Sequence, residues 1–260
     1  MRKTKIVLGV LLLLVVVVLW SGREPERAAL TLAPLGNAAI PGAVLVVGGT
    51  RATGLEIVRL LRLRGDEVVV FARPNSNVAA IEKLGAKIAR GNAMNAADVG
   101  NAFAANKFRA VVSTLGTTGK DRPRPDFEGN KHVIDAAKAA GVKRLVLITV
   151  IGAGDSQGVE PWIAGRFLKE VIALKTQAET YLQASGLDYT IIRPGGLFDK
   201  PAHGSAFLTA DTRSFSWITR GDLAQLTVRA LDDASTAGKT LHAFDPARTR
   251  FWSIRENFSK

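Results

Sequence analysis

A glycine-rich turn directly after an aliphatic run carries the clearest chemical signal in the sequence. The run is Ala43-Val-Leu-Val-Val47, and Gly48-Gly-Thr-Arg-Ala-Thr-Gly54 follows it without a break. A buried strand, a glycine turn and a helix in this order point backbone N–H groups, and the positive end of the helix dipole, at the pyrophosphate of a dinucleotide. The predicted coenzyme contacts in this turn are Gly48, Thr50, Arg51, Ala52, Thr53 and Gly54.

The end of the next predicted strand indicates which dinucleotide is bound. Glu67-Val-Val-Val-Phe71 is followed by Ala72-Arg73, where many such sites carry an acid. An acid accepts a hydrogen bond from the ribose 2′-hydroxyl of NAD, whereas an arginine accommodates the 2′-phosphate of NADP. Arg73, with Arg51, therefore favours NADP(H) over NAD(H). The alternative for Arg73 is a solvated strand end.

Strands and helices alternate along most of the chain that must position these residues. The predicted strands cover residues 43–47, 67–71, 87–89, 109–113, 144–148 and 188–192. Helices are predicted from near residue 55 to a stop at Gly65, and at 77–84, 96–103, 126–140 and 165–184. This alternation predicts an α/β fold of the Rossmann type, a doubly wound parallel sheet that binds ligands at the carboxyl ends of its strands. Because little chain follows Pro194, we expect a small C-terminal substrate region.

The amino terminus has the pattern of a membrane or export signal. Three basic residues, Arg2, Lys3 and Lys5, precede fifteen apolar residues from Ile6 to Trp20. A helix of that length rises about 22 Å, which is short of a hydrocarbon core of roughly 30 Å. The small-residue pair of a cleavage site is missing after Trp20, which favours an uncleaved anchor over a signal peptide. We expect membrane attachment through residues 6–20, with the side of the membrane left open.

These patterns divide the chain into three parts. Residues 1–22 are the signal anchor or signal peptide, 23–41 form a tether, and 42–260 form one NAD(P)-binding Rossmann domain.

Composition limits the classes of partner. Lys and Arg number 35 against 23 Asp and Glu, a net charge of +12 that suits coenzyme phosphates or lipid headgroups. Aromatic residues do not interleave with the basic ones, so we expect no nucleic-acid partner. The chain has no cysteine, which excludes disulfides and thiolate chemistry. Its three histidines lack ligand spacing, so no metal site is predicted.

Further motifs, taken in order, resemble one known family. They are Gly91-Asn92, Glu128-Gly-Asn130, Ala136-Ala-Lys-Ala-Ala-Gly141, Lys175-Thr-Gln-Ala-Glu179, Ser185-Gly-Leu-Asp-Tyr-Thr-Ile-Ile-Arg-Pro194 and Ile218-Thr-Arg-Gly-Asp222. With the glycine turn they resemble the atypical short-chain dehydrogenase/reductases, in particular the NAD(P)H-binding group of NmrA-like proteins and flavin and biliverdin reductases.

The resemblance implies the remainder of the coenzyme site. The implied positions are Asn92 at the adenine edge with its neighbour Ala93, Thr114, Leu115 and Gly116 beneath the nicotinamide, Thr149 beside it, and Lys175 at its ribose. Lys175 is also the candidate catalytic residue; its alternative is a solvated helix lysine. Glu179 and Asp222 are expected to be structural, with Asp222 capping a helix.

The sequence departs from the family pattern at several positions. Arg51 replaces the middle glycine of the turn, which requires a negative φ there. Asn92 replaces an aspartate. The usual tyrosine, four residues before Lys175, is Val171, and Val150 stands where a polar residue usually follows the fifth strand. The hydroxyl acid of the better-known members is therefore absent.

Hydride transfer can proceed without that hydroxyl when a conjugated ring accepts it. We therefore expect an NADPH-dependent reductase of a small flavin, quinone or tetrapyrrole-type acceptor. The alternative is a non-catalytic NADP(H)-binding sensor or assembly factor that holds a protein partner at a membrane. An isomerase or epimerase would need an acid/base pair that the pattern does not show. A basic loop at residues 117–124 either attracts an acidic substrate or lipid headgroups, or is simply solvated.

Overall fold

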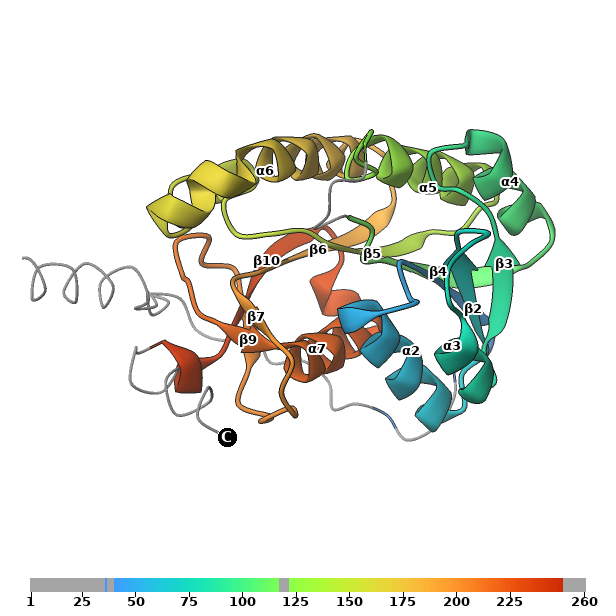
Figure 1. Cartoon of the computed structure of the whole chain (residues 1–260), viewed down its shortest axis with the longest axis horizontal. Helices are drawn as coiled ribbons and strands as arrows, with labels where there is room; N and C mark the ends of the chain where they lie inside the picture. The colour runs from blue at the N-terminus through green and yellow to red at the C-terminus, as the bar shows by residue number, and fades with distance from the viewer. Residues whose placement is uncertain (1–35, 37–39, 117–121, 250–260) are drawn as a thin grey trace, which may run out of the picture.

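A sheet of eight strands, covered on both faces by helices, carries the site (Figure 1). The computed structural model describes residues 36, 40–116 and 122–249. The strand order is β3-β2-β1-β4-β5-β6-β10-β8, parallel throughout except that β8 is antiparallel to β10. The bounds are β1 Ala43–Val47, β2 Val68–Ala72, β3 Lys87–Arg90, β4 Phe108–Ser113, β5 Arg144–Ile148, β6 Asp188–Pro194, β8 Phe207–Thr209 and β10 Lys239–Phe244.

The strand order reverses at β1. From β1 the chain builds outward through β2 and β3, then returns to place β4, β5 and β6 on the other side. A doubly wound order of this kind opens a crevice between β1 and β4, at the carboxyl ends of the strands. The predicted Rossmann-like α/β fold with a mostly parallel sheet is confirmed, and every predicted strand is present.

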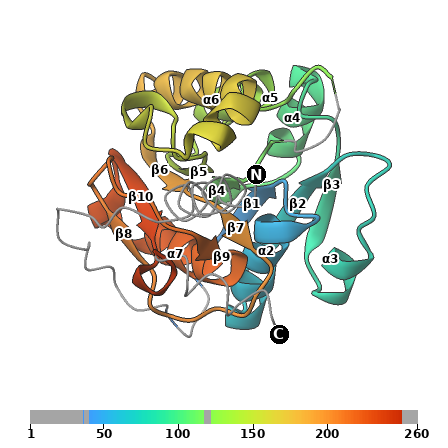
Figure 2. The ribbon, with the colours of Figure 1, turned by 60° about the vertical axis from the view of Figure 1, so that its left-hand side comes forward.

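The two helical layers are separated by the sheet, as both views show (Figures 1 and 2). One layer holds α2 Ala52–Arg64, α3 Ala79–Lys83 and α7 Arg220–Asp232, and the other holds α4 Ala96–Ala104, α5 Glu128–Ala139 and α6 Trp162–Gln183. Strand β1 is buried along its whole length, with Val44 and Val46 in the core beneath α2 and Leu45 and Val47 in the core beneath α5. Burial on both faces explains why this strand is a continuous aliphatic run.

The chain after Pro194 contributes more to the sheet than its length suggested. Strand β10 inserts beside β6, β8 adds an edge, and β7 Leu197–Phe198 pairs with β9 Ile218–Thr219 in a separate ribbon. The sequence prediction missed β10 because the buried His242 interrupts its apolar run. The Nδ1 atom of His242 lies 2.8 Å from the Ser214 carbonyl oxygen, so the strand accommodates a polar ring by hydrogen bonding.

The chain enters the domain at the edge opposite the crevice. The backbone N–H of Ile40 donates to the Asp66 carboxylate over 3.1 Å, just before β2. Asp66 is fully buried and also pairs with Arg64 and Arg109. Residues 6–20 and most of the predicted tether lie outside the described ranges. Within those ranges, no helix combines the length and apolar character needed to cross a bilayer.

Candidate functional site

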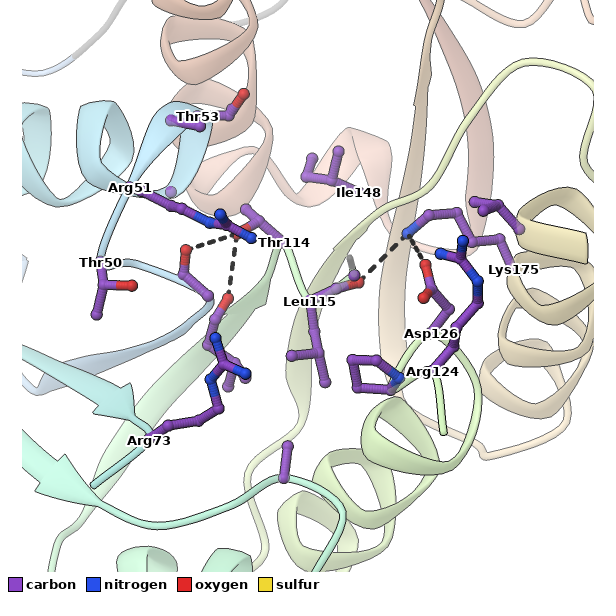
Figure 3. A pocket seen from close by; sticks show the side chains of 18 of the residues that line it. Thr50, Arg51, Thr53, Arg73, Thr114, Leu115, Arg124, Asp126, Ile148 and Lys175 are labelled. Atoms are coloured by element: carbon purple, nitrogen blue, oxygen red, sulfur yellow. Dashed lines mark hydrogen bonds and ion pairs between the residues drawn. The ribbon is translucent and has the colours of Figure 1, made fainter. Parts of the chain in front are cut away.

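A cavity of about 990 Å³ lies above the point where the strand order reverses (Figure 3). It is lined from the ends of β1, β4, β5 and β6, where the fold predicts a ligand. All of the predicted coenzyme positions line it: Gly48, Thr50, Arg51, Ala52, Thr53, Gly54, Arg73, Asn92, Ala93, Thr114, Leu115, Gly116, Thr149 and Lys175. The fold therefore brings these residues together, and their contacts with a coenzyme remain a prediction.

The glycine turn is shaped by two close backbone approaches. Gly48 has a φ of +82°, and a Cβ atom on it would lie 2.6 Å from Thr114 Oγ1. A Cβ atom on Gly54 would lie 2.2 Å from the carbonyl oxygen of Gly48. The first glycine therefore permits the turn and the last permits α2 to approach β1. Thr114 locks the arrangement by donating to the Gly48 carbonyl over 3.2 Å.

The amino terminus of α2 is open toward the cavity. Arg51 is extended, with a φ of −158°, so the condition for an arginine at this position is met. Arg51 makes no capping hydrogen bond through its side chain within the described structure, and the first turn of α2 contains no acid. Its first N–H groups therefore lack the usual side-chain acceptor and can receive an anion. Ala52 takes a positive φ of +51° to start the helix.

The end of the cavity beside β2 is basic. Arg73 follows β2 and is exposed, and both Arg73 and Arg51 line the cavity (Figure 3). Asn92 forms a local turn in which its side-chain oxygen accepts from the Met94 N–H over 3.1 Å. Its own N–H donates to Asp98 over 2.8 Å. The amide nitrogen of Asn92 is the part of that side chain outside this turn, and it can donate to an adenine edge.

Lys175 lies in a buried ion pair that sequence reasoning missed (Figure 3). Its Nζ is 3.4 Å from Asp126 Oδ1 and donates to the Leu115 carbonyl over 3.3 Å. Asp126 is fully buried, and its carboxylate oxygens have no hydrogen-bond partner in the described structure. The sequence placed Asp126 at the start of a helix, but α5 begins two residues later, at Glu128. In the sequence, the one sign of this ion pair is the acidic residue that ends the proline-rich stretch Arg122-Pro-Arg-Pro-Asp126.

This ion pair is suited to hold a lysine in place. Asp126 lines the cavity although it has no solvent exposure, and its carboxylate holds the Lys175 amine at the cavity wall. Val171 lies one turn earlier on α6 and also lines the cavity. Among the described lining residues there is no tyrosine, histidine or cysteine, so the hydroxyl acid is missing from the pocket as well as from the motif.

Thr149 faces a structural network and has its hydroxyl occupied. It donates to Glu179 Oε1 over 2.6 Å, and Glu179 in turn forms two hydrogen bonds with the buried Arg193. Burial would lower the pKa of Arg193, but the carboxylates of Glu179 and Asp155 raise it. Thr149 can therefore shape the cavity wall, while its proton is already committed. Glu179 has the structural role expected of it.

Asp222 has a different structural role from the one predicted. The cap of α7 is Thr219, whose hydroxyl oxygen accepts from the Asp222 N–H over 2.9 Å. The Asp222 carboxylate accepts from the Thr219 hydroxyl and from the N–H groups of His203 and Gly204. Asp222 thus ties the loop after β7 to α7, because the third helical position faces that loop.

The side of the cavity next to α6 is bordered by a strap, residues 122–126, that pairs with that helix. Arg122 and Arg124 both line the cavity and both pair with Glu170 of α6. The basic loop predicted at 117–124 is therefore partly neutralised; residues 117–121 lie outside the described ranges. Phe167 and Leu168, also from α6, form the mouth beside the strap. In the described part of the chain, no cluster of three or more His, Asp or Glu side chains could hold a metal.

Several known proteins are similar to this chain in sequence and in fold. The NAD(P)H-binding family model matches residues 48–234. The "uncharacterized sugar epimerase YhfK" of Bacillus subtilis is 31% identical over 207 residues, covering 78% of this chain and 92% of that protein. The photosystem II assembly factor Ycf39 of Synechocystis is 28% identical over 225 residues, covering 82% of this chain and 64% of Ycf39.

Solved structures extend the likeness. ChuY from Escherichia coli O157:H7, described as an anaerobillin reductase, superposes with a TM-score of 0.71 at 28% identity, covering 78% of this chain and 97% of ChuY. The match therefore covers nearly the whole length of ChuY. The family model spans well over half of the chain, and the chain belongs to the NAD(P)H-binding family.

Proposed function

We propose that this protein is an NADPH-dependent reductase of a flat conjugated acceptor. The observation that carries the proposal is the continuity of the cavity. It runs from the open amino terminus of α2, past Lys175, to an apolar mouth formed by Phe167, Leu168 and Val171. A dinucleotide laid along the first part would bring its nicotinamide to the second, where an apolar ring can stack.

The coenzyme end favours the phosphorylated form. Arg51 and Arg73 line the cavity where β2 ends, and the strand end carries no acid to accept from a ribose 2′-hydroxyl. The N–H groups of α2 supply the pyrophosphate site. These groups together fit NADP(H) better than NAD(H).

The chain's residues then orient the reaction. When bound, NADPH supplies a hydride to the acceptor. Lys175, held by Asp126 and the Leu115 carbonyl, is placed to hydrogen-bond the nicotinamide ribose and fix the ring against the cavity floor. Because no tyrosine lines the described cavity and the Thr149 hydroxyl already donates to Glu179, the acceptor takes its proton from water at the open mouth. A conjugated acceptor is required, since its ring delocalises the incoming electron pair.

Similarity to ChuY supports reduction over other chemistries, because that relative is described as an anaerobillin reductase and matches over 97% of its length. The test is NADPH oxidation by the purified chain with a panel of flavins, quinones and tetrapyrroles. We expect turnover above the buffer rate with at least one class, and loss of that turnover in Gly54→Ala. Absence of turnover with every class would overturn the proposal.

A second candidate function is a coenzyme-dependent assembly factor. It is favoured by the likeness to Ycf39 and by Val171, which removes the usual proton donor. Under this function the chain would bind NADPH without oxidising it, and a protein partner would co-purify with the coenzyme-loaded form and not with the coenzyme-free form. Partner capture independent of NADPH would contradict it.

A further inference from the structure

The first turns of α6 expose large apolar side chains beside the mouth of the cavity. Phe167 is 82% exposed and Trp162 is 63% exposed, and Leu168 follows at 36%. These three lie within seven residues of one helix, although large apolar residues are normally covered. Three exposed large apolar side chains on the first two turns of one helix, two of them at the cavity, mark a segment that meets something other than water.

This end of α6 is not used to build the fold. The later part of the helix packs on the sheet through Ala178 and Leu182, which are buried in the core. The start of the helix extends outward at one end of the molecule, in yellow in Figure 1, and comes forward in Figure 2. Its apolar side chains are therefore free to serve a contact outside the domain.

Exposed basic side chains lie on the same turns of α6 and on the neighbouring strap. Arg166 and Lys169 are exposed on the same turns of α6, and Arg122 of the strap is 56% exposed next to Glu170. Glu170 is the acid in this segment of α6, and it already pairs with Arg122 and Arg124. Aromatic rings flanked by exposed cations match the interfacial layer of a bilayer, where rings sit at headgroup level and cations meet lipid phosphates.

The chain outside the described ranges points to the same occupant. Ile6 to Trp20 is continuously apolar and follows three basic residues. The nineteen residues between Trp20 and Ile40 can span roughly 60 Å when extended. A domain of this size is about 45 Å across, from a radius of gyration near 17 Å. The tether can therefore let the α6 end face a membrane, even though Ile40 enters at the opposite edge.

We propose that residues 162–169 of α6 dock into the interfacial layer of a bilayer containing anionic lipid. Trp162 and Phe167 insert among the headgroups, while Arg166 and Lys169 contact their phosphates. Because Phe167 and Leu168 also line the cavity, its mouth opens at the lipid surface, and a lipid-dissolved ligand reaches it without crossing water. The docking surface stands whether or not the chain is a reductase.

Quenching of a single tryptophan tests this docking directly. The full chain, with Trp20, Trp217 and Trp252 replaced by Phe, keeps Trp162 as its one tryptophan. It is mixed with phosphatidylcholine and phosphatidylglycerol vesicles whose acyl chains carry bromine. We expect the emission of Trp162 to fall by roughly half, as for a ring at the interface. The matched control keeps Trp217 instead, which is half-buried against Phe198, and should be quenched much less.

Two substitutions separate docking by α6 from attachment by the amino terminus alone. Phe167→Glu should relieve the quenching of Trp162, whereas Leu63→Glu, at a leucine of α2 that is also highly exposed, should not. If the triple replacement fails to fold, the difference between the wild type and Trp162→Phe gives the same quantity. Quenching of Trp162 no greater than that of Trp217 would overturn the proposal, and so would equal effects of the two glutamates.

Discussion

The two ends of the cavity are built in different ways. The coenzyme end depends on backbone approach within a few residues: Gly48 and Gly54 lie six positions apart, and their closeness is fixed by the turn. The acceptor end is assembled from side chains far apart in sequence, such as Lys175 with Asp126 and Glu170 with Arg122. A close approach between backbone atoms within one turn requires glycines at a fixed spacing in the sequence. Side chains that pair across the fold require no fixed spacing. The sequence can therefore predict the first end, whereas the second end becomes visible only in the folded structure.

The largest effect is expected from a substitution that disrupts only the coenzyme end of the cavity. In Gly54→Ala, the new Cβ would lie 2.2 Å from the Gly48 carbonyl oxygen, so the turn must shift. We expect NADPH affinity to fall roughly 100-fold, since a displacement of about 1 Å can cost that much, and stability to fall by about 1–3 kcal/mol. The matched control is Gly100→Ala in α4, where nothing lies within 4 Å. Calorimetric titration and urea unfolding measure both variants, and equal losses would refute the close-approach account.

A second substitution tests the ion pair at the acceptor end. Lys175→Met leaves the buried Asp126 carboxylate without its charged partner, which should reduce the free energy of unfolding by about 3 kcal/mol. Adding Asp126→Asn removes that uncompensated charge. The double variant should therefore be more stable than the sum of the two single changes predicts, by at least about 1 kcal/mol. Simple additivity in urea unfolding would show that the two residues are not coupled.

Acid should weaken the side of the sheet that carries β10. Burial lowers the pKa of His242 from 6.5 to about 4. Between these pH values the unfolded chain binds a proton that the folded chain does not. Stability is then full above pH 6.5 and falls by up to about 3 kcal/mol as the pH drops to 4. His242→Gln should lose this part of the pH dependence, as measured by urea unfolding across that range. Parallel curves for variant and wild type would contradict the assignment.

The smallest effect is expected from a substitution that tests whether the protein prefers NADPH to NADH. Arg73→Ala should weaken NADPH about tenfold, the loss of roughly 1.4 kcal/mol from one phosphate contact. NADH affinity should stay within error, because that coenzyme lacks the 2′-phosphate. Arg59→Ala serves as the control: Arg59 is also exposed and basic, but it pairs with Glu56 along α2 and does not line the cavity. Similar losses for both coenzymes would remove the case for NADPH.

The sequence predicted the parts of the molecule that local rules determine. The aliphatic run of β1 and the turn after it follow from burial and glycine geometry, and the negative φ required of Arg51 was found. Strand β10 could not be read in the same way, because His242 is stabilised by Ser214, far away in sequence. Asp126 was hidden for a similar reason: its partner is Lys175, on another helix.

The predictions that were corrected at single residues also concern tertiary contacts and not local sequence. Asp222 was expected to cap α7, but Thr219 does so, and the carboxylate binds a loop that only the fold brings near. Thr149 lines the cavity as expected, yet its hydroxyl is occupied by Glu179. Sequence spacing can place a residue at the cavity, while the partners of its polar atoms depend on the tertiary structure.

The central claim is that the open start of α2, with Arg51 and Arg73, binds a phosphorylated dinucleotide. The direct test is a calorimetric titration of the purified full chain with NADPH and, separately, with NADH. The account predicts saturable one-to-one binding of NADPH, at least about tenfold tighter than that of NADH. Absence of binding heat with both coenzymes, confirmed by unchanged nicotinamide fluorescence, would contradict it.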